Sequence, residues 1–230
     1  MIMPRVMILI AGFFALTTAS LAGVSDIERS PNETGPSSAG AFNRWLFTSE
    51  AHHLGWKAQY YAGFQGFLER EGVAGVVPTW QLWRVDAQYA SRCGSDYFAV
   101  IPEERWHEIV TTLKLLRDEV IPVTGPLEVM SAYRTPQINR CVNGASQSRH
   151  LSFSALDLVA TDRSDRHRLF ADLCAMHRRV GRATGMGLGA YFDPKDSERG
   201  ASGRFHIDAA GFRDWGFDYT ARSSPCPQLS

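Results

Sequence analysis

Two short segments that lie far apart in this 230-residue chain contain side chains able to bind one metal ion. Residues 148–157 include His150 and Asp157, and residues 204–208 include His206. Two imidazoles and one carboxylate suit zinc, and three protein ligands leave a fourth position open, as in catalytic zinc sites. We therefore expect the fold to bring these three side chains together.

The segment around His206 alternates as a β-strand does. Because successive side chains of a strand point to opposite faces, Arg204, His206 and Asp208 share one face. Phe205 and Ile207 share the other face and can pack on a helix. The alternation predicts that His206 and Asp208 lie on the side of a cleft.

Asp157 lies on a predicted strand between apolar neighbours on the same face, Ala155 and Val159. A carboxylate is costly to bury there unless something pairs with it, and a metal ion would do so. His150, in the turn before this strand, can fold back to the same ion. Most histidines are instead surface or hydrogen-bonded core residues, which is the role expected for His52, His53, His107, His167 and His177.

Length and charge limit the class of protein. The chain is long enough for one sizeable domain. It has 24 basic and 24 acidic residues, a formal net charge of +0, which does not indicate a nucleic-acid partner. A polar or zwitterionic substrate is compatible with that balance, and the oligomeric state is left open.

Residues 1–22 are typical of a Sec-type signal peptide. Arg5 precedes an apolar run, residues 6–16, that is too short to span a bilayer. Ser20-Leu21-Ala22 then offers small residues before a cut after Ala22. This pattern predicts a periplasmic or secreted bacterial protein with no membrane segment after cleavage; an anchor helix is the alternative.

Four cysteines lie beyond the signal segment, and an even count in an exported chain suggests two disulfides. Three pairings are possible. We favour Cys93–Cys141 with Cys174–Cys226, because the second bridge would tie down the C-terminal tail. Cys174 lies on the apolar face of a predicted helix, so a free buried thiol is the alternative there.

The chain divides by composition into four parts. After the signal, residues 23–40 are rich in Ser, Gly, Pro and Asn and read as a flexible leader. Residues 41–92 are aromatic-rich and helical in spacing, and residues 93–230 form the main domain. Packing onto that domain is the favoured role for the aromatic region, and a wall-binding module is the alternative.

The main domain reads as an α+β fold with a small antiparallel sheet flanked by helices. A helix follows Pro102, and Pro122, Gly125 and Pro126 are expected to break it. Ser164 can cap a second helix. The apolar face of the first comprises Trp106, Ile109, Val110, Leu113, Leu116 and Val120, and that of the second comprises Leu169, Phe170, Leu173, Cys174, His177 and Val180. Strands are expected at residues 127–133, 154–159, 187–192 and 204–207, with a loop at 193–202.

A third segment, residues 131–139, reads Ser-Ala-Tyr-Arg-Thr-Pro-Gln-Ile-Asn. With it, the chain resembles the zinc D-Ala-D-Ala carboxypeptidases and related peptidoglycan peptidases, LAS-type metallopeptidases with a hedgehog-like fold. That family has Ser-x-Tyr-Arg, then Ser-x-His with six residues before Asp, then His-x-Asp. All three occur here in order, at residues 131–134, 148–157 and 206–208. The resemblance covers about residues 93–219.

The resemblance implies roles for individual residues. His150, Asp157 and His206 would hold zinc, which would act as a Lewis acid and lower the pKa of its water. Arg134 would polarise the scissile carbonyl or hold a substrate carboxylate through its planar guanidinium. A structural salt bridge is the alternative for Arg134.

One position departs from the family pattern. Many members have a Glu or Asp three residues before the last zinc histidine as general base, and Gly203 stands there. Asp208 is either that base or an orienter of His206, and we favour the orienter. The base would then come from the preceding loop, with Glu198 favoured on reach over Asp193 and Asp196.

The sequence therefore predicts an exported zinc peptidase that hydrolyses amide bonds in peptidoglycan stem peptides. Carboxypeptidase and endopeptidase action are not separated by it. Gly203 keeps a different class open: a cell-wall-binding or scaffold protein on the same fold that binds zinc without hydrolysis.

Overall fold

The computed structural model describes residues 35–48, 55–196 and 203–229. The predicted signal peptide, most of the predicted leader and Glu198 lie outside the described residues. Within the described ranges, no helix has both the length and the apolar character that a bilayer crossing requires.

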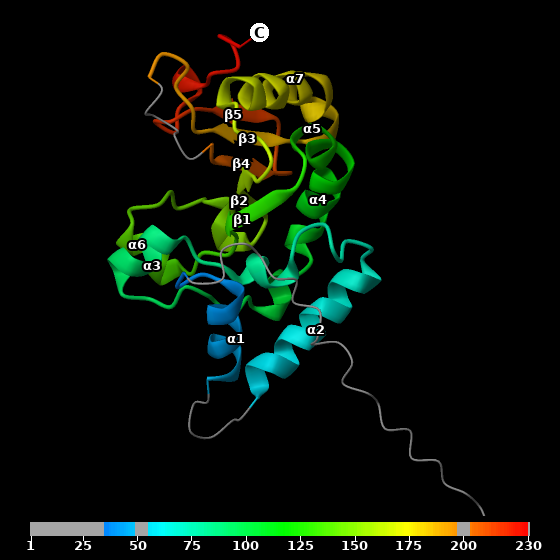
Figure 1. Ribbon diagram of the computed structural model, residues 1–230, viewed down its shortest axis with the longest axis vertical. Coiled ribbons are helices and arrows are strands. Elements are labelled where there is room, and N and C mark those ends of the chain that lie inside the picture. The colour runs from blue at the N-terminus through cyan, green and yellow to red at the C-terminus, as the bar shows by residue number, and fades with distance from the viewer. Residues whose placement is uncertain (1–34, 49–54, 197–202, 230) are drawn as a thin grey trace, which may run out of the picture.

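A five-stranded sheet forms the centre of the main domain, and the predicted α+β class is confirmed (Figure 1). Its spatial order is β1-β2-β4-β3-β5, and neighbouring strands are antiparallel except β3 and β5, which are parallel. The bounds are β1 Leu127–Ser131, β2 Ala155–Ala160, β3 Gly187–Ala190, β4 Phe205–Asp208 and β5 Arg213–Trp215. Strand β5 was not expected, because three half-buried residues with two charges show no apolar alternation.

Two strands end earlier than the sequence predicts. Strand β1 stops at Ser131 because the next backbone groups bond elsewhere: Ala132 N donates to Arg84 O at 3.2 Å, and Arg134 N donates to His150 O at 3.0 Å. Strand β3 stops at Ala190, whose carbonyl accepts from Phe192 N in a tight turn. The first departure matters for the site, since it places Arg134 beside His150.

The helix after Pro102 keeps its predicted apolar face, and all six of its predicted core residues are buried. The expected break at Pro122 is wrong. Helix α4 (Glu108–Leu115) continues through a π-helical turn at Leu116–Val120 into α5 (Ile121–Thr124). Pro122 lies two residues after the π-helical turn within this continuous helix, and Gly125 ends the helix.

Helix α7 (Arg166–Thr184) lies beside β3 and β5 at one end of the molecule (Figure 1). Its cap is Asp165 rather than the predicted Ser164: Asp165 Oδ1 accepts a hydrogen bond from Arg168 N at 3.0 Å. The predicted face is buried from Leu169 to His177, while Val180 is only half-buried.

The aromatic region forms α1 (Ala39–Phe47), α2 (Trp56–Arg70) and a 3-10 turn at Thr79–Trp83, at the opposite end from α7 (Figure 1). Helix α1 begins before the expected boundary at residue 41, with Ser38 as its cap. Trp83 is fully buried, and Phe64 packs against Phe153 of the main domain at 6.0 Å between ring centroids. One hydrophobic core therefore joins the two regions.

Both predicted disulfides are confirmed. Helices α3 (Ala87–Cys93) and α6 (Pro136–Cys141) lie side by side, and Cys93–Cys141 joins their last residues (Figure 1). Cys174–Cys226 joins α7 to the C-terminal tail, as expected. The second bridge is buried, whereas Cys93 is half-buried and Cys141 exposed.

Candidate active site

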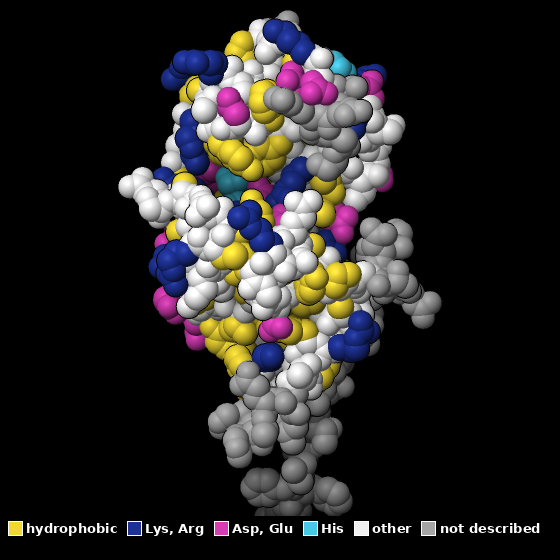
Figure 2. Space-filling view, turned by 90° about the vertical axis from the view of Figure 1, so that its left-hand side faces the viewer, with side chains coloured by type: hydrophobic (Ala, Val, Ile, Leu, Met, Phe, Trp, Pro, Cys, Tyr) yellow, Lys and Arg dark blue, Asp and Glu magenta, His cyan; other side chains and the backbone are white. Residues whose placement is uncertain are grey.

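The three predicted ligands meet at the floor of a cleft of about 1180 Å³. Figure 2 shows histidine at the bottom of this hollow with basic side chains around it. The cleft lies between the sheet on one side and α3 with the loop after α6 on the other, because its lining includes Tyr89 and Gly144 as well as Trp215.

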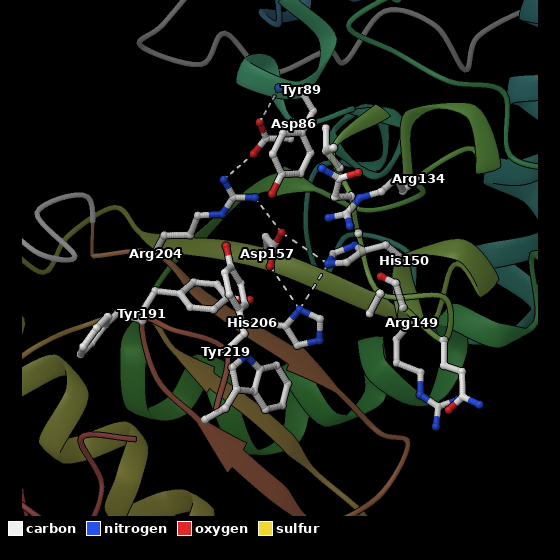
Figure 3. A pocket seen from close by; sticks show the side chains of 18 of the residues that line it. Asp86, Tyr89, Arg134, Arg149, His150, Asp157, Tyr191, Arg204, His206 and Tyr219 are labelled. Atoms are coloured by element: carbon white, nitrogen blue, oxygen red, sulfur yellow. Dashed lines mark hydrogen bonds and ion pairs between the residues drawn. The ribbon is translucent and has the colours of Figure 1, made fainter. Parts of the chain in front are cut away.

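The ligand group comes from three local structures. His150 lies in the 3-10 turn at Arg149–Ser152, before β2. Asp157 and His206 are directly opposite each other in the register of β2 and β4. His150 Nε2 lies 3.2 Å from His206 Nδ1 and 3.4 Å from Asp157 Oδ2, and His206 Nδ1 lies 3.2 Å from Asp157 Oδ1 (Figure 3).

The outer hydrogen bonds of the two imidazoles determine which ring nitrogens face the group. His150 Nδ1 donates to the carbonyl of Ala132 at 2.7 Å, and His206 Nε2 donates to Asp208 Oδ2 at 2.9 Å. Each neutral ring then has its lone pair on the nitrogen that faces Asp157. Two imidazole lone pairs and the Asp157 carboxylate therefore face one another, an arrangement that a cation stabilises.

The separations fit zinc. A tetrahedral ion with bonds of about 2.0 to 2.1 Å places neighbouring ligand atoms about 3.3 Å apart. The two imidazole nitrogens lie 3.2 Å apart, and they lie 3.4 Å from Asp157 Oδ2 (His150) and 3.2 Å from Asp157 Oδ1 (His206). One ligand atom from each residue lies within 4.8 Å of the other two. His150, Asp157 and His206 are all buried, so the group is already arranged around one point.

The electrostatics differ between the two histidines of the group. Burial lowers the pKa of His150, which keeps its imidazole neutral, as a metal ligand must be. Burial opposes ionisation of Asp157, but the charge of Arg204 and hydrogen bonds from the surrounding side chains hold the pKa of that carboxyl well below its usual range. For His206, burial lowers the pKa, but hydrogen bonds to Asp157 and Asp208 raise it above its ordinary value, so this ring, unlike that of His150, favours a positive charge beside Asp157.

Asp208 lies behind His206 rather than in the cleft. Its carboxylate is fully buried and accepts from Ala210 N at 2.8 Å and from Arg213 Nη2 at 2.6 Å, besides the histidine. Burial raises its pKa, but His206 and Arg213 together lower it to about 2. This position suits the orienter role, because the carboxylate is surrounded by donors and has no path to a substrate.

Two residues next to the ligands had no predicted role. Arg204 Nη2 donates to Asp157 Oδ2 at 2.6 Å, and its other terminal nitrogen pairs with Asp86, the N-cap of α3 (Figure 3). The alternation of side chains along the strand places Arg204 on the same face as His206, and this is the sequence signal that could have identified it as a neighbour of the ligands. Asp86 lies 71 residues before Asp157 in the chain, and no local pattern connects them.

Arg134 lies beside His150 at the cleft (Figure 3). Its Nη1 donates to Asn139 Oδ1 at 3.3 Å, and its guanidinium lies 5.0 Å from the ring centroid of Tyr89. Among the described residues no carboxylate pairs with it, and its buried Nε has no hydrogen-bond partner. The guanidinium lines the cleft without a carboxylate partner, so the alternative of a structural salt bridge has no partner within the described chain.

Gly203 stands where the family has its general base, and four described residues near the cleft are candidates for that role or for a hydrogen-bond donor. Gly203 has a φ of +65°, in the left-handed region that favours glycine, so it also serves the backbone turn into β4. Asp86 and Asp157 line the cleft with both carboxylates engaged by Arg204. Asp193 accepts from Lys195 N in its own loop and does not line the cleft. Tyr191 does line it, and burial raises its pKa well above the usual range, so it is a neutral donor.

The fold and this ligand group define the class: a zinc metallopeptidase. Residues 89–191 match the family model described as Peptidase M15, so over this segment the chain is similar to that family of zinc-dependent peptidases. The matched segment contains Arg134, His150 and Asp157 and ends before His206, which β4 brings to the group. No curated protein and no solved structure matches the chain.

Proposed function

We propose that this metallopeptidase is exported and hydrolyses amide bonds in peptidoglycan stem peptides. The observation that carries the proposal is the pairing of two features in one cleft: three converged zinc ligands and a buried arginine whose Nε has no partner among the described residues. A stem peptide supplies what both need, an amide carbonyl and carboxylate groups.

The chemistry divides between the metal and the protein. When bound, zinc would polarise the scissile carbonyl and lower the pKa of a coordinated water. Arg134 would hold a carboxylate or the carbonyl oxygen through its fork of donors. Asp208 would keep His206 in the tautomer that presents Nδ1 to the cleft, and the protonated Tyr191 would donate a hydrogen bond.

Export is supported by the sequence pattern of residues 1–22 and by the two disulfides. Disulfides persist in oxidising compartments and are rare in the cytosol. Stem peptides lie in the same compartment, so the proposed location and substrate agree. The basic side chains at the cleft, Arg134 and Arg149, fit a substrate with several carboxylates.

The test is digestion of purified sacculi by the mature protein, with products separated and identified by mass spectrometry. We expect new stem peptides that disappear with a chelator and return with added zinc. The masses of the products show whether a terminal D-Ala or an internal bond is cut. Intact sacculi after incubation with the zinc-loaded protein would refute the proposal.

A second function has one observation in its favour. Within the described part of the cleft, Arg204 engages the carboxylates of Asp86 and Asp157, and the remaining carboxylate, that of Asp214, lies 3.8 Å from His177 Nδ1. A zinc-binding wall protein without hydrolytic activity fits that feature. Co-sedimentation of the zinc-loaded protein with sacculi, without any released peptide, would favour this alternative over the peptidase.

A further inference from the structure

We infer that Tyr89 and Asn139 are positioning residues for Arg134, and that the Cys93–Cys141 disulfide holds them in place as a clamp. The inference rests on the proposed function only for the reaction that Arg134 serves. The clamp itself is defined by contacts among described residues, and it joins the aromatic N-terminal region to the active site.

The guanidinium of Arg134 is enclosed on several sides. The Tyr89 ring lies below it at 5.0 Å, and Asn139 Oδ1 accepts from Nη1 at 3.3 Å. Gly144 closes a third side: a Cβ there would lie 3.1 Å from Nη1 of Arg134 and 2.2 Å from Asn139 Oδ1. Asn139 Nδ2 also donates to the carbonyls of Gly144 and Ala145, so the loop and the side chain are held together.

Tyr89 and Asn139 come from different regions of the chain. Tyr89 lies on α3, in the aromatic region, and Asn139 lies on α6, which begins two residues after Arg134. The disulfide joins the last residues of these two helices. Because Tyr89 is half-buried and its contact with Arg134 is a single cation–π pair, non-covalent contacts alone hold this spacing weakly.

The second disulfide is a matched control within the same chain. Cys174–Cys226 spans 52 residues and Cys93–Cys141 spans 48, so the two constrain the unfolded chain almost equally. Cys174–Cys226 joins α7 to the tail, and neither cysteine lines the cleft. A difference in catalysis between the two disulfide deletions therefore reports the clamp rather than general stability.

The first experiment compares C93A/C141A with C174A/C226A on a synthetic stem pentapeptide ending in D-Ala-D-Ala, with zinc content measured in parallel. We expect C93A/C141A to keep its zinc and lose up to about 100-fold in kcat/KM, the scale of a displaced positioning group. C174A/C226A should keep its zinc and its activity. Equal activity in the two variants would overturn the clamp.

A milder pair of substitutions, both at Tyr89, keeps both disulfides and so avoids a folding failure. Tyr89→Leu removes the ring under Arg134 and should lower kcat/KM about 2- to 5-fold, the size of a partly exposed cation–π contact. Tyr89→Phe keeps the ring face and should retain wild-type activity. Loss of activity in Tyr89→Phe equal to that in Tyr89→Leu would exclude the ring stack.

A third measurement separates failure of the clamp from failure of the proposed function. Phenylglyoxal modifies accessible arginines, and mass spectrometry reads the rate at Arg134, with the exposed Arg149 as internal reference. We expect faster modification of Arg134 in C93A/C141A than in C174A/C226A. If the wild type does not cut stem peptides but this difference appears, the clamp stands and the substrate proposal fails; equal rates overturn the clamp.

Discussion

The two walls of the cleft hold their functional side chains by different means. On the metal wall, Asp157 and His206 face each other across β2 and β4, and their positions follow from backbone pairing and burial. On the arginine wall, Arg134 lies outside any strand, between two short helices joined by a partly exposed disulfide.

This difference separates two functions. Sheet register resists local perturbation, because a slip by one residue moves every side chain to the other face. The spacing of α3 and α6 has no such constraint. Damage to the metal wall should therefore appear first as lost zinc, and damage to the arginine wall as slower catalysis with zinc retained.

Removal of a ligand histidine should have the largest effect on the metal wall. We expect one zinc per wild-type chain and none after dialysis of His150→Ala or His206→Ala, because two remaining ligands hold zinc poorly. Elemental analysis measures this directly. His107→Ala is the control, since that side chain is 68% exposed and should leave the zinc content unchanged. Full zinc occupancy in His150→Ala would contradict the ligand assignment.

Arg134→Lys should have the largest effect on the arginine wall. An ammonium cannot reproduce the bidentate fork, so we expect about 100-fold slower turnover of a stem peptide, the scale of one lost transition-state donor. Zinc content and the thermal unfolding midpoint should stay at wild-type values. Unchanged hydrolysis would return Arg134 to a structural role, whereas lost zinc would show that the two walls are not separable.

Asp208→Asn tests whether Asp208 orients His206 on the metal wall, and its effect should be smaller than that of removing a ligand. Asn can still accept from His206, but the charge that pairs with Arg213 is lost. We expect zinc affinity to fall about 10- to 100-fold, with activity restored by added zinc. A competition titration against a chromogenic chelator measures the affinity. A dead enzyme at full zinc occupancy would instead make Asp208 the base.

Local patterns predicted on which strand faces the residues of the metal wall lie. The period of two along a strand placed His206 and Asp208 on one face, and it depends only on neighbouring residues. The apolar spacing around Ile109 and Leu169 predicted two buried helix faces for a similar reason. The resemblance then connected these segments, which periodicity alone cannot do.

The arginine wall was only partly predictable. Arg134 followed from the family motif, and the pairing of Cys93 with Cys141 from cysteine count and position. The contacts of Tyr89 and Asp86 depend on how α3 docks against the main domain, and no spacing in the sequence encodes that docking. Strand β5 was missed because it gains its partners from β3 rather than from its own apolar pattern.

The smallest expected effect compares the stability of the two disulfide deletions. Loop closure predicts a loss of about 4 kcal/mol for either one, because their loops are nearly equal in length. Burial differs, however: Cys174 is fully buried and Cys141 exposed. Truncation to alanine therefore leaves a void only at the buried bridge, and we expect C174A/C226A to lose about 1 kcal/mol more than C93A/C141A.

Urea denaturation at equal zinc loading gives the unfolding free energy of both variants. C174A/C226A should then be the less stable but the more active of the two variants. If the less stable variant is instead the less active one, the arginine wall depends on overall stability rather than on its own disulfide.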